Sequence, residues 1–197
     1  MEENHPEFER GLSRAAGPAA IRAGTGYDSH RFDPARPLIL GGVHFPDHPG
    51  LSGFSDGDAV VHAVIDALLG ATGLGDIGTH YPPGDERWRG ADSMGLLSRV
   101  VAMLHAEDWR VGNIDVTVVC ESPRIGPRAA ELRRLLAERM EVEPEAVSVK
   151  GKSNEKMGWI GRGEGIAVHA VALVARHAGG TGDRSVPGGK AAASTDP

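Results

Sequence analysis

The chain has 197 residues, of which 40% are hydrophobic and 24% are charged, which is ordinary for a soluble globular protein of one domain. Its net charge of −6 argues against a basic surface for nucleic acid. One cysteine excludes an intramolecular disulfide framework, and no apolar run approaches the roughly 20 residues of a membrane helix. The N-terminus also lacks an apolar signal region, so we expect a cytoplasmic protein.

Residues 1–19 and 179–197 are expected to be disordered tails. The first segment is polar or small without a clear period, and the last is rich in Gly, Ser and Pro. The folded domain is therefore expected over residues 20–178. It begins with a short β-compatible run that leads into "GYDSHRF", and "PLILGG" and "VHF" then predict two strands joined by a glycine turn.

Three helices and three further strands are predicted in the rest of the domain. The first helix covers residues 56–70, with Ser55 as N-cap and Gly70 or Gly73 as stop. "ADSMGLLSRVVAMLHAED" and "PRAAELRRLLAERM" predict the other two helices. "RVGNIDVTVVCE" alternates as a half-buried strand does, "AVSVK" is a strand, and "GIAVHAVALVA" is apolar on both faces like a central strand. This mixture predicts an α/β fold of the α+β type, with a mixed sheet packed against helices.

A metal site is the first chemical hypothesis. An extended strand would place Asp28 and His30 on one face, although such a pair is also found as an acid–base pair or a hydrogen-bonded strand end. His62 on the first helix adds a third donor and shares a helix face with Asp58 and Asp66, a pattern that a solvated polar stripe also shows. Together, the aspartate and the two histidines would form a catalytic zinc set with an open fourth position. Asp58 or Asp66 would orient the His62 imidazole.

Phosphate binding is the second hypothesis. The Gly-Lys-Ser of "AVSVKGKSNE" lacks the loop and helix of a P-loop, and "GTGYDS" opens no helix, so nucleotide-binding loops of both kinds are rejected. Ser55 at a helix start can present its hydroxyl and backbone N–H groups to an anion. Lys152, Ser153 and Arg162 surround Glu155 in a Gly-rich stretch, which suits a divalent ion bridging phosphates or else a turn with surface charges.

These motifs, in this order, resemble the 2-C-methyl-D-erythritol 2,4-cyclodiphosphate synthase family of the non-mevalonate isoprenoid pathway. The resemblance covers residues 21–177 and is carried by "GYDSHRF", "LILGGV", "SDGDAVVHAVIDALLG", "GLGDIG", "YPPGD", "GNIDVTVVCESPRIGP" and "NEKMGWIGRGEGIAVHAVAL". It implies a homotrimer with active sites between subunits. It also implies a phosphorus–oxygen lyase that converts 4-diphosphocytidyl-2-C-methyl-D-erythritol 2-phosphate to the cyclodiphosphate and CMP, by attack of the 2-phosphate on the β-phosphate.

The resemblance also implies residue roles. Zinc or another divalent transition metal would bind Asp28, His30 and His62, and magnesium or manganese would bind Glu155 and the substrate phosphates. Ser153 would support the transition state. Substrate contacts would come from three groups of residues and two cavity residues: Ser55, Asp76, Ile77, Gly78, Tyr81 and Asp85 for the phosphate and the methylerythritol end; Cys120, Glu121, Ser122, Pro123, Arg124, Ile125 and Gly126 for cytidine; Lys152 and Asn154 for the nucleotide phosphates; Trp159 and Arg162 for the trimer's central cavity, which in some members admits an isoprenoid diphosphate.

Phe54 is the main departure from the family pattern. It stands where a histidine is expected to place the reacting phosphate, and losing one such donor costs about 2–4 kcal/mol of transition-state stabilisation. Ser153 for threonine keeps a hydroxyl, and Lys152 for a small residue adds charge. A second hypothesis is therefore a weakly catalytic or non-catalytic phospholigand-binding trimer. The sequence places neither His44 nor His48 relative to this gap.

Overall fold

The computed structural model describes residues 20–176, so the two expected tails and the last two residues of the predicted domain lie outside the described residues. One mixed sheet has the strand order β2-β1-β5-β3-β4, in which only β3 and β4 pair in parallel. Its strands are β1 Ala20–Leu40, β2 Val43–Leu51, β3 Trp109–Val119, β4 Val147–Lys152 and β5 Gly165–Arg176. The single mixed α+β domain that was predicted is confirmed.

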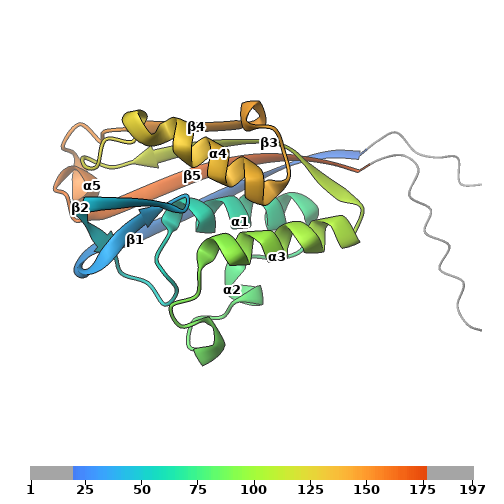
Figure 1. Ribbon diagram of the computed structural model, residues 1–197, viewed down its shortest axis with the longest axis horizontal. Coiled ribbons are helices and arrows are strands. Elements are labelled where there is room, and N and C mark those ends of the chain that lie inside the picture. Colours follow the sequence, from blue (N-terminus) through green and yellow to red (C-terminus); the bar gives the residue numbers. More distant parts are fainter. Residues whose placement is uncertain (1–19, 177–197) are drawn as a thin grey trace, which may run out of the picture.

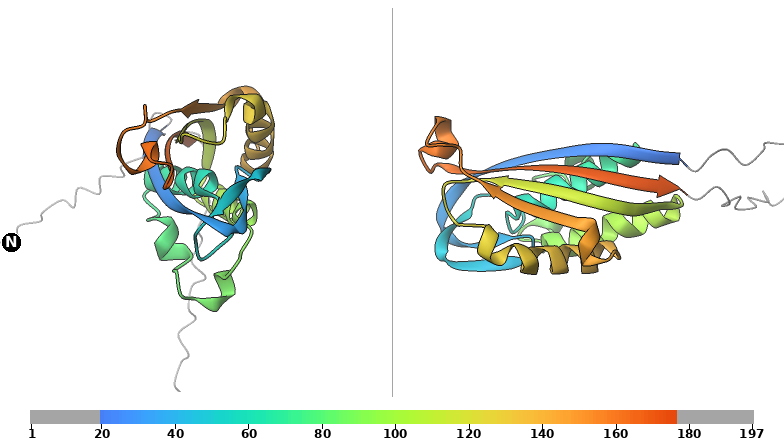
Figure 2. Two further views of the ribbon diagram at one scale, coloured as in Figure 1. Left: turned by 90° about the vertical axis from the view of Figure 1, so that its left-hand side faces the viewer. Right: turned by 90° about the horizontal axis from the view of Figure 1, so that it is seen from above.

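The helices gather on one side of the central strands (Figure 1). Figure 2 shows the long strands β1, β5 and β3 running side by side above them. The bounds are α1 Ala59–Thr72, α2 Ile77–His80, α3 Ser93–Ala106, α4 Ala129–Met140 and α5 Gly158–Gly161, with 3-10 turns at Glu86–Trp88, Gly126–Arg128 and Pro144–Ala146. Within residues 20–176, no helix is long and apolar enough to span a bilayer.

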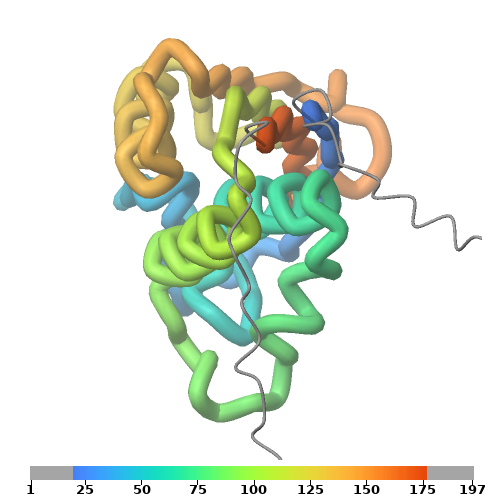
Figure 3. Tube along the Cα trace, turned by 90° about the vertical axis from the view of Figure 1, so that its right-hand side faces the viewer, coloured from blue at the N-terminus to red at the C-terminus, as the bar shows by residue number. Residues whose placement is uncertain are grey.

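Helix α1 is the centre of the core and lies between the sheet and α3 (Figure 3). Its predicted inward residues are confirmed, because Val64, Ile65 and Leu68 are fully buried. The predicted start is wrong by three residues. Ser55 is not the N-cap; the Asp58 carboxylate accepts from the N–H groups of residues 60 and 61, and the helix begins at Ala59.

Strand β1 approaches α1 unusually closely at Gly26. A Cβ added at Gly26 would lie 1.9 Å from the Ala63 carbonyl oxygen, so only glycine allows this contact. The strand therefore passes directly over the turn of α1 that carries His62. Two residues further on, Asp28 points toward the same helix, which is how the sequence "GYDSH" brings the strand donors to the helix donor.

Strand β5 occupies the predicted central position, but only one of its faces is buried in the described chain. Val171 and Leu173 remain 44% and 39% exposed, and Tyr27 and Ile21 of the paired β1 lie on the same exposed face. The helices cover the opposite face. The expectation of two buried faces is therefore wrong for the single chain. The four exposed residues form an apolar stripe.

In β3, Ile114, Val116 and Val118 point inward as predicted.

Candidate metal centre and adjoining cavities

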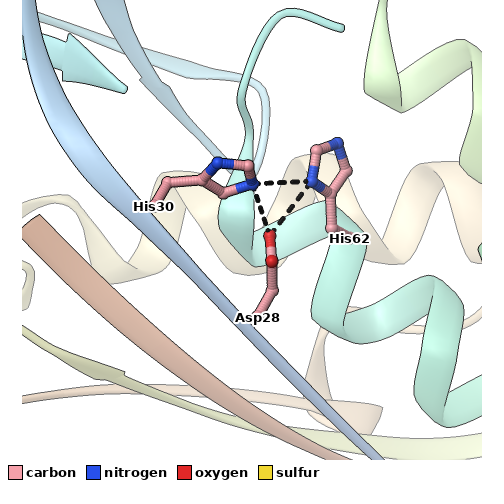
Figure 4. Close-up of side chains that lie close together, drawn as sticks. All are labelled: Asp28, His30 and His62. Atoms are coloured by element: carbon pink, nitrogen blue, oxygen red, sulfur yellow. Dashed lines mark hydrogen bonds and ion pairs between the residues drawn. The ribbon is translucent and has the colours of Figure 1, made fainter. Parts of the chain in front are cut away.

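Asp28, His30 and His62 converge on one point, two of them from β1 and one from α1 (Figure 4). Asp28 Oδ2 lies 2.9 Å from His30 Nε2 and 3.0 Å from His62 Nδ1, and the two ring nitrogens are 3.3 Å apart. Donor atoms of a tetrahedral zinc ion at about 2.0–2.2 Å are themselves separated by roughly 3.3 Å. The chemistry and spacing of the three donors therefore fit a divalent metal ion, as predicted.

The charges of the cluster are suited to binding a cation. Burial alone would raise the pKa of Asp28, but its hydrogen bonds and charge interactions with His30 and His62 outweigh this and hold the pKa well below its usual range. Burial would lower the pKa of His30, yet the hydrogen bond and charge of Asp28 raise it above 6.5. Asp28 is thus an anion at neutral pH, and protons compete with a metal for His30.

The second nitrogen of His62 is held by hydroxyl groups rather than by the predicted carboxylates. His62 Nε2 lies 3.0 Å from Ser55 Oγ and 3.0 Å from Ser93 Oγ. Asp58 is fully buried as the N-cap of α1 and also accepts from the N–H groups of the glycine turn 41–42. Asp66 accepts from the N–H of Ile77. The prediction that Asp58 or Asp66 orients the imidazole is therefore wrong, because both carboxylates are occupied by backbone donors.

A cavity of about 250 Å³ opens beside the metal cluster. Of the predicted substrate residues, Ser55, Ile77, Gly78 and Tyr81 line it, together with Phe54. Asp76 and Asp85 are absent from its lining; their carboxylates cap α2 and the 3-10 turn that follows. The remaining wall is largely apolar and consists of Pro83, Trp88 and Leu96, with Asp66 as a further carboxylate near the three metal donors.

Phe54 lies against an arginine side chain. The guanidinium carbon of Arg89 lies 4.6 Å from the centre of its ring, and Gly90 N–H donates to the Phe54 carbonyl over 2.9 Å. Arg89 also forms an exposed ion pair with Glu86 at 2.6 Å. The ring of Phe54, which lines the metal cavity, is therefore stacked with an arginine.

The two histidines considered for this gap lie elsewhere. The carbonyl oxygen of His44 accepts from Arg128, and His48 Nδ1 lies 3.3 Å from Ser122 Oγ, in the segment before α4. Neither histidine lines the cavity that contains Phe54. Neither His44 nor His48 therefore supplies an imidazole to the cavity beside Phe54.

A larger cavity of about 520 Å³ holds most of the residues predicted for cytidine. Its lining includes Cys120, Glu121, Pro123, Arg124, Ile125 and Gly126. Lys152 and Ser153, at the end of β4, also line it. Ser122 and Asn154 are not in the lining. Burial raises the pKa of Cys120 to about 11, so its thiol is a neutral wall group and not a nucleophile.

Glu155, the predicted magnesium ligand, sits in an exposed turn beside this cavity. Its Oε1 accepts from Ser153 Oγ over 2.7 Å. Glu155 and Lys156 both adopt left-handed backbone conformations, with φ of 48° and 60°, and Glu121 Oε1 accepts from the N–H groups of Asn154 and Lys156 at 3.1 Å each. Glu121 thus anchors the backbone of this turn, and the Glu155 side chain is exposed.

Trp159 and Arg162 lie at a third, smaller hollow. Trp159 lines a cavity of about 200 Å³ with His30, Arg31 and Glu164. Arg162 is outside the lining but forms an ion pair with Glu164 at 2.7 Å. This hollow and the metal cavity share one lining residue, His30.

Three residues around the metal cavity were missed in the sequence. Asp56 accepts from the N–H and the hydroxyl of Ser93, and the Arg36 guanidinium donates to the carbonyl oxygens of residues 53 and 55. Asp56 and Ser93 are 37 positions apart, and Arg36 precedes its acceptors by 17 and 19. No local spacing signals such contacts. The one available hint was the first Asp of "SDGD", Asp56, which the predicted helix over 56–70 included as its first residue.

Comparison with known proteins places this arrangement in a family. Residues 21–175 match the model of the YgbB family. A curated 2-C-methyl-D-erythritol 2,4-cyclodiphosphate synthase of Symbiobacterium thermophilum is 55% identical over 152 residues, which cover 77% of this chain and 97% of that protein. A synthase of the same name from Xylella fastidiosa is 49% identical over 79% of this chain and 89% of its own length.

Solved structures agree with the sequence matches. IspF of Plasmodium falciparum, in complex with CDP, superposes with a TM-score of 0.70 at 31% identity, over 79% of this chain and 96% of that one. The bifunctional IspDF of Campylobacter jejuni gives a TM-score of 0.78 at 36% identity, over 81% of this chain. This chain spans 43% of that bifunctional protein, so the likeness concerns one part of it.

Proposed function

The chain belongs to the YgbB family, and from this we propose that it forms 2-C-methyl-D-erythritol 2,4-cyclodiphosphate and CMP from 4-diphosphocytidyl-2-C-methyl-D-erythritol 2-phosphate. It is a lyase-type enzyme of isoprenoid biosynthesis. The observation that carries the proposal is the convergence of Asp28, His30 and His62 in the lining of a cavity large enough for a phosphate group. The synthase domain would span residues 20–178 of a cytoplasmic enzyme.

The metal cavity would hold the reacting phosphates. Zinc at the three donors and magnesium at Glu155, when bound, would neutralise phosphate charge and polarise phosphoryl oxygens. Ser55 lines the cavity 3.0 Å from His62 and can donate its hydroxyl to a phosphate oxygen. The apolar wall around Tyr81 and Trp88 would exclude water and hold the methylerythritol carbon chain in a ring-like pose, which favours intramolecular attack.

The larger cavity would hold the cytidine diphosphate end of the substrate. Its wall combines backbone groups of the segment 120–126 with the cations Arg124 and Lys152. Ser153, hydrogen-bonded to Glu155, would support the charge that develops as CMP leaves. The CDP complex of the Plasmodium falciparum relative supports a cytidine nucleotide as ligand.

A homotrimer is the proposed assembly. Two features support it: the apolar stripe of β1 and β5, which a neighbouring subunit would cover, and the separation of the predicted site residues between two cavities that share no lining residue. A neighbour would bring its nucleotide cavity against the metal cavity. The Trp159 hollow would then open toward the centre of the assembly, where an isoprenoid diphosphate is the proposed ligand.

The alternative of a non-catalytic binding trimer, motivated by Phe54, finds no support in the comparisons, because relatives at about half identity carry the synthase name. The direct test measures CMP release from the substrate with purified protein and magnesium, before and after zinc removal. We expect release that falls on chelation and returns with zinc. Absence of CMP from zinc-loaded protein would overturn the proposed activity.

A further inference from the structure

Ser93 links the metal cluster to Asp56, a residue that touches neither the metal donors nor either cavity. Ser93 is fully buried in the first turn of α3. Its Oγ lies 3.0 Å from His62 Nε2 and 2.5 Å from Asp56 Oδ1, and its N–H donates to Asp56 Oδ2 over 2.9 Å. A continuous hydrogen-bonded path therefore runs from Asp56 through one serine to a metal donor.

The direction of these hydrogen bonds follows from the donors around Asp56. Its carboxylate receives the N–H and O–H of Ser93 and the N–H of Asp58, the last over 3.1 Å. A carboxylate can only accept hydrogen bonds. The Ser93 hydroxyl therefore gives its one hydrogen to Asp56, and its oxygen accepts from His62 Nε2–H.

We infer that Asp56 and Ser93 are positioning residues that hold His62 in the Nε2–H tautomer when a metal ion replaces the hydrogen bond between Nδ1 and Asp28. A neutral imidazole with hydrogen on Nε2 has its lone pair on Nδ1, the atom that lies 3.0 Å from Asp28 and 3.3 Å from His30. The opposite tautomer would place a hydrogen where the metal has to bind. We call this pair of hydrogen bonds the tautomer lock. It rests on the zinc site of the proposed function and explains why His62 Nδ1 is ready to bind zinc.

The lock also sets the direction of the Ser55 hydroxyl. Ser55 Oγ lies 3.0 Å from the same His62 Nε2 and accepts from Gly57 N–H at 3.4 Å. Because Nε2 is a donor, Ser55 cannot donate to it, and its hydrogen is free for an acceptor in the cavity that Ser55 lines. Phe54 beside it offers no donor, so Ser55 is the polar side chain that this loop presents to an anion.

Zinc affinity of the full chain tests the lock without any activity measurement. Zinc would be titrated against a chromophoric chelator for Ser93→Ala, Asp56→Asn and the control Ser98→Ala. The Ser98 hydroxyl lies on the same helix and donates to the Met94 carbonyl oxygen. We expect about 10- to 100-fold weaker zinc binding in the first two variants and no change in the control. Ser93→Thr, which keeps the hydroxyl, should retain most of the affinity.

Asp56→Asn is the decisive variant, because it preserves shape while its amide can donate to Ser93. The serine would then turn its hydrogen toward His62 Nε2 and drive the imidazole proton onto Nδ1. The Asp56→Asn variant also keeps the test valid if Ser93→Ala fails to fold. Wild-type zinc affinity in folded Asp56→Asn would overturn the inference, as would an equal loss in Ser98→Ala. CMP release by the wild type is judged separately, so the proposed function can fail or hold independently.

Discussion

The metal donors and the groups around Glu155 differ in how the chain holds them. Asp28, His30 and His62 have side chains that are 22% exposed or less. Lys152, Ser153 and Glu155 beside the larger cavity are exposed. The first set lies on β1 and α1, whereas the second lies at the end of β4 and in the exposed turn that follows it.

This difference shows which part of the chemistry one chain prepares by itself. The metal cluster needs no partner to bring its donors within zinc-binding distance of each other, because Gly26 seats β1 on α1 and hydroxyls hold His62. Within residues 20–176, the Glu155 carboxylate has one side-chain partner, Ser153, so the proposed magnesium ion would take its other ligands from substrate, water or a neighbouring subunit. Zinc binding should therefore survive changes that abolish magnesium dependence.

The largest expected effect comes from His62→Ala. Removing the helix donor leaves two ligands, so bound zinc should fall to background by elemental analysis and CMP release should drop by about 10³-fold or more. Light scattering should give the same mass as for the wild type, which is that of a trimer if the proposed assembly is right, because the apolar stripe is untouched. A full zinc complement in this variant would reject His62 as a ligand.

Glu155→Gln should separate the two sites. Gln cannot neutralise a cation, so we expect CMP release to fall roughly 100-fold at saturating magnesium while zinc content stays at the wild-type value. The control is Glu145→Gln, which changes a glutamate in the 3-10 turn before β4 and should alter neither quantity. Loss of zinc from Glu155→Gln would mean that the two regions are coupled within one chain.

Local periodicity predicted much of this fold. The alternation of Ile114, Val116 and Val118 identified β3, and the apolar face of α1 was correct. The start of α1 was placed too early because Ser55 and Asp58 both suit a cap. The structure uses Asp58, since its carboxylate also satisfies the 41–42 turn. The hydrogen bonds from the 41–42 turn come from another part of the chain, so the helix sequence alone does not reveal them.

In the candidate site too, the residues that local sequence could identify differ from those that depend on tertiary contacts. Asp28 and His30 followed from strand geometry, and His62 was found because its type suits zinc. Ser93 and Asp56 were missed because serine and aspartate near helix starts ordinarily serve as caps, and only the folded chain brings residues 37 positions apart into contact. Hydrogen-bonded supports of a site depend on tertiary contacts to a greater degree than its ligands do.

Phe54→His should give a moderate gain. An imidazole at this cavity wall could donate to the reacting phosphate, which Phe54 cannot, but Ser55 already supplies one hydroxyl. We therefore expect CMP release to rise by about tenfold rather than by the full 10²–10³ of a sole donor. Zinc content should not change. An unchanged rate would show that Phe54 does not stand at a phosphate-placing position.

The smallest effect is the pH dependence of zinc binding to the metal cluster. Burial lowers the pKa of His30, but the hydrogen bond to Asp28 raises it above 6.5, and zinc binds only the neutral imidazole. Affinity should therefore be complete above the raised pKa of His30 and fall about tenfold for each pH unit below it, as one proton competes for Nε2. Chelator competition from about pH 8.5 to about pH 5.5 measures this slope. His105→Gln, which removes a histidine paired with Glu141 away from the cluster, should leave the curve unchanged. A wild-type curve that stays flat until well below pH 6 would contradict the raised pKa and with it the tight coupling of Asp28 to His30 that makes the cluster ready for a cation.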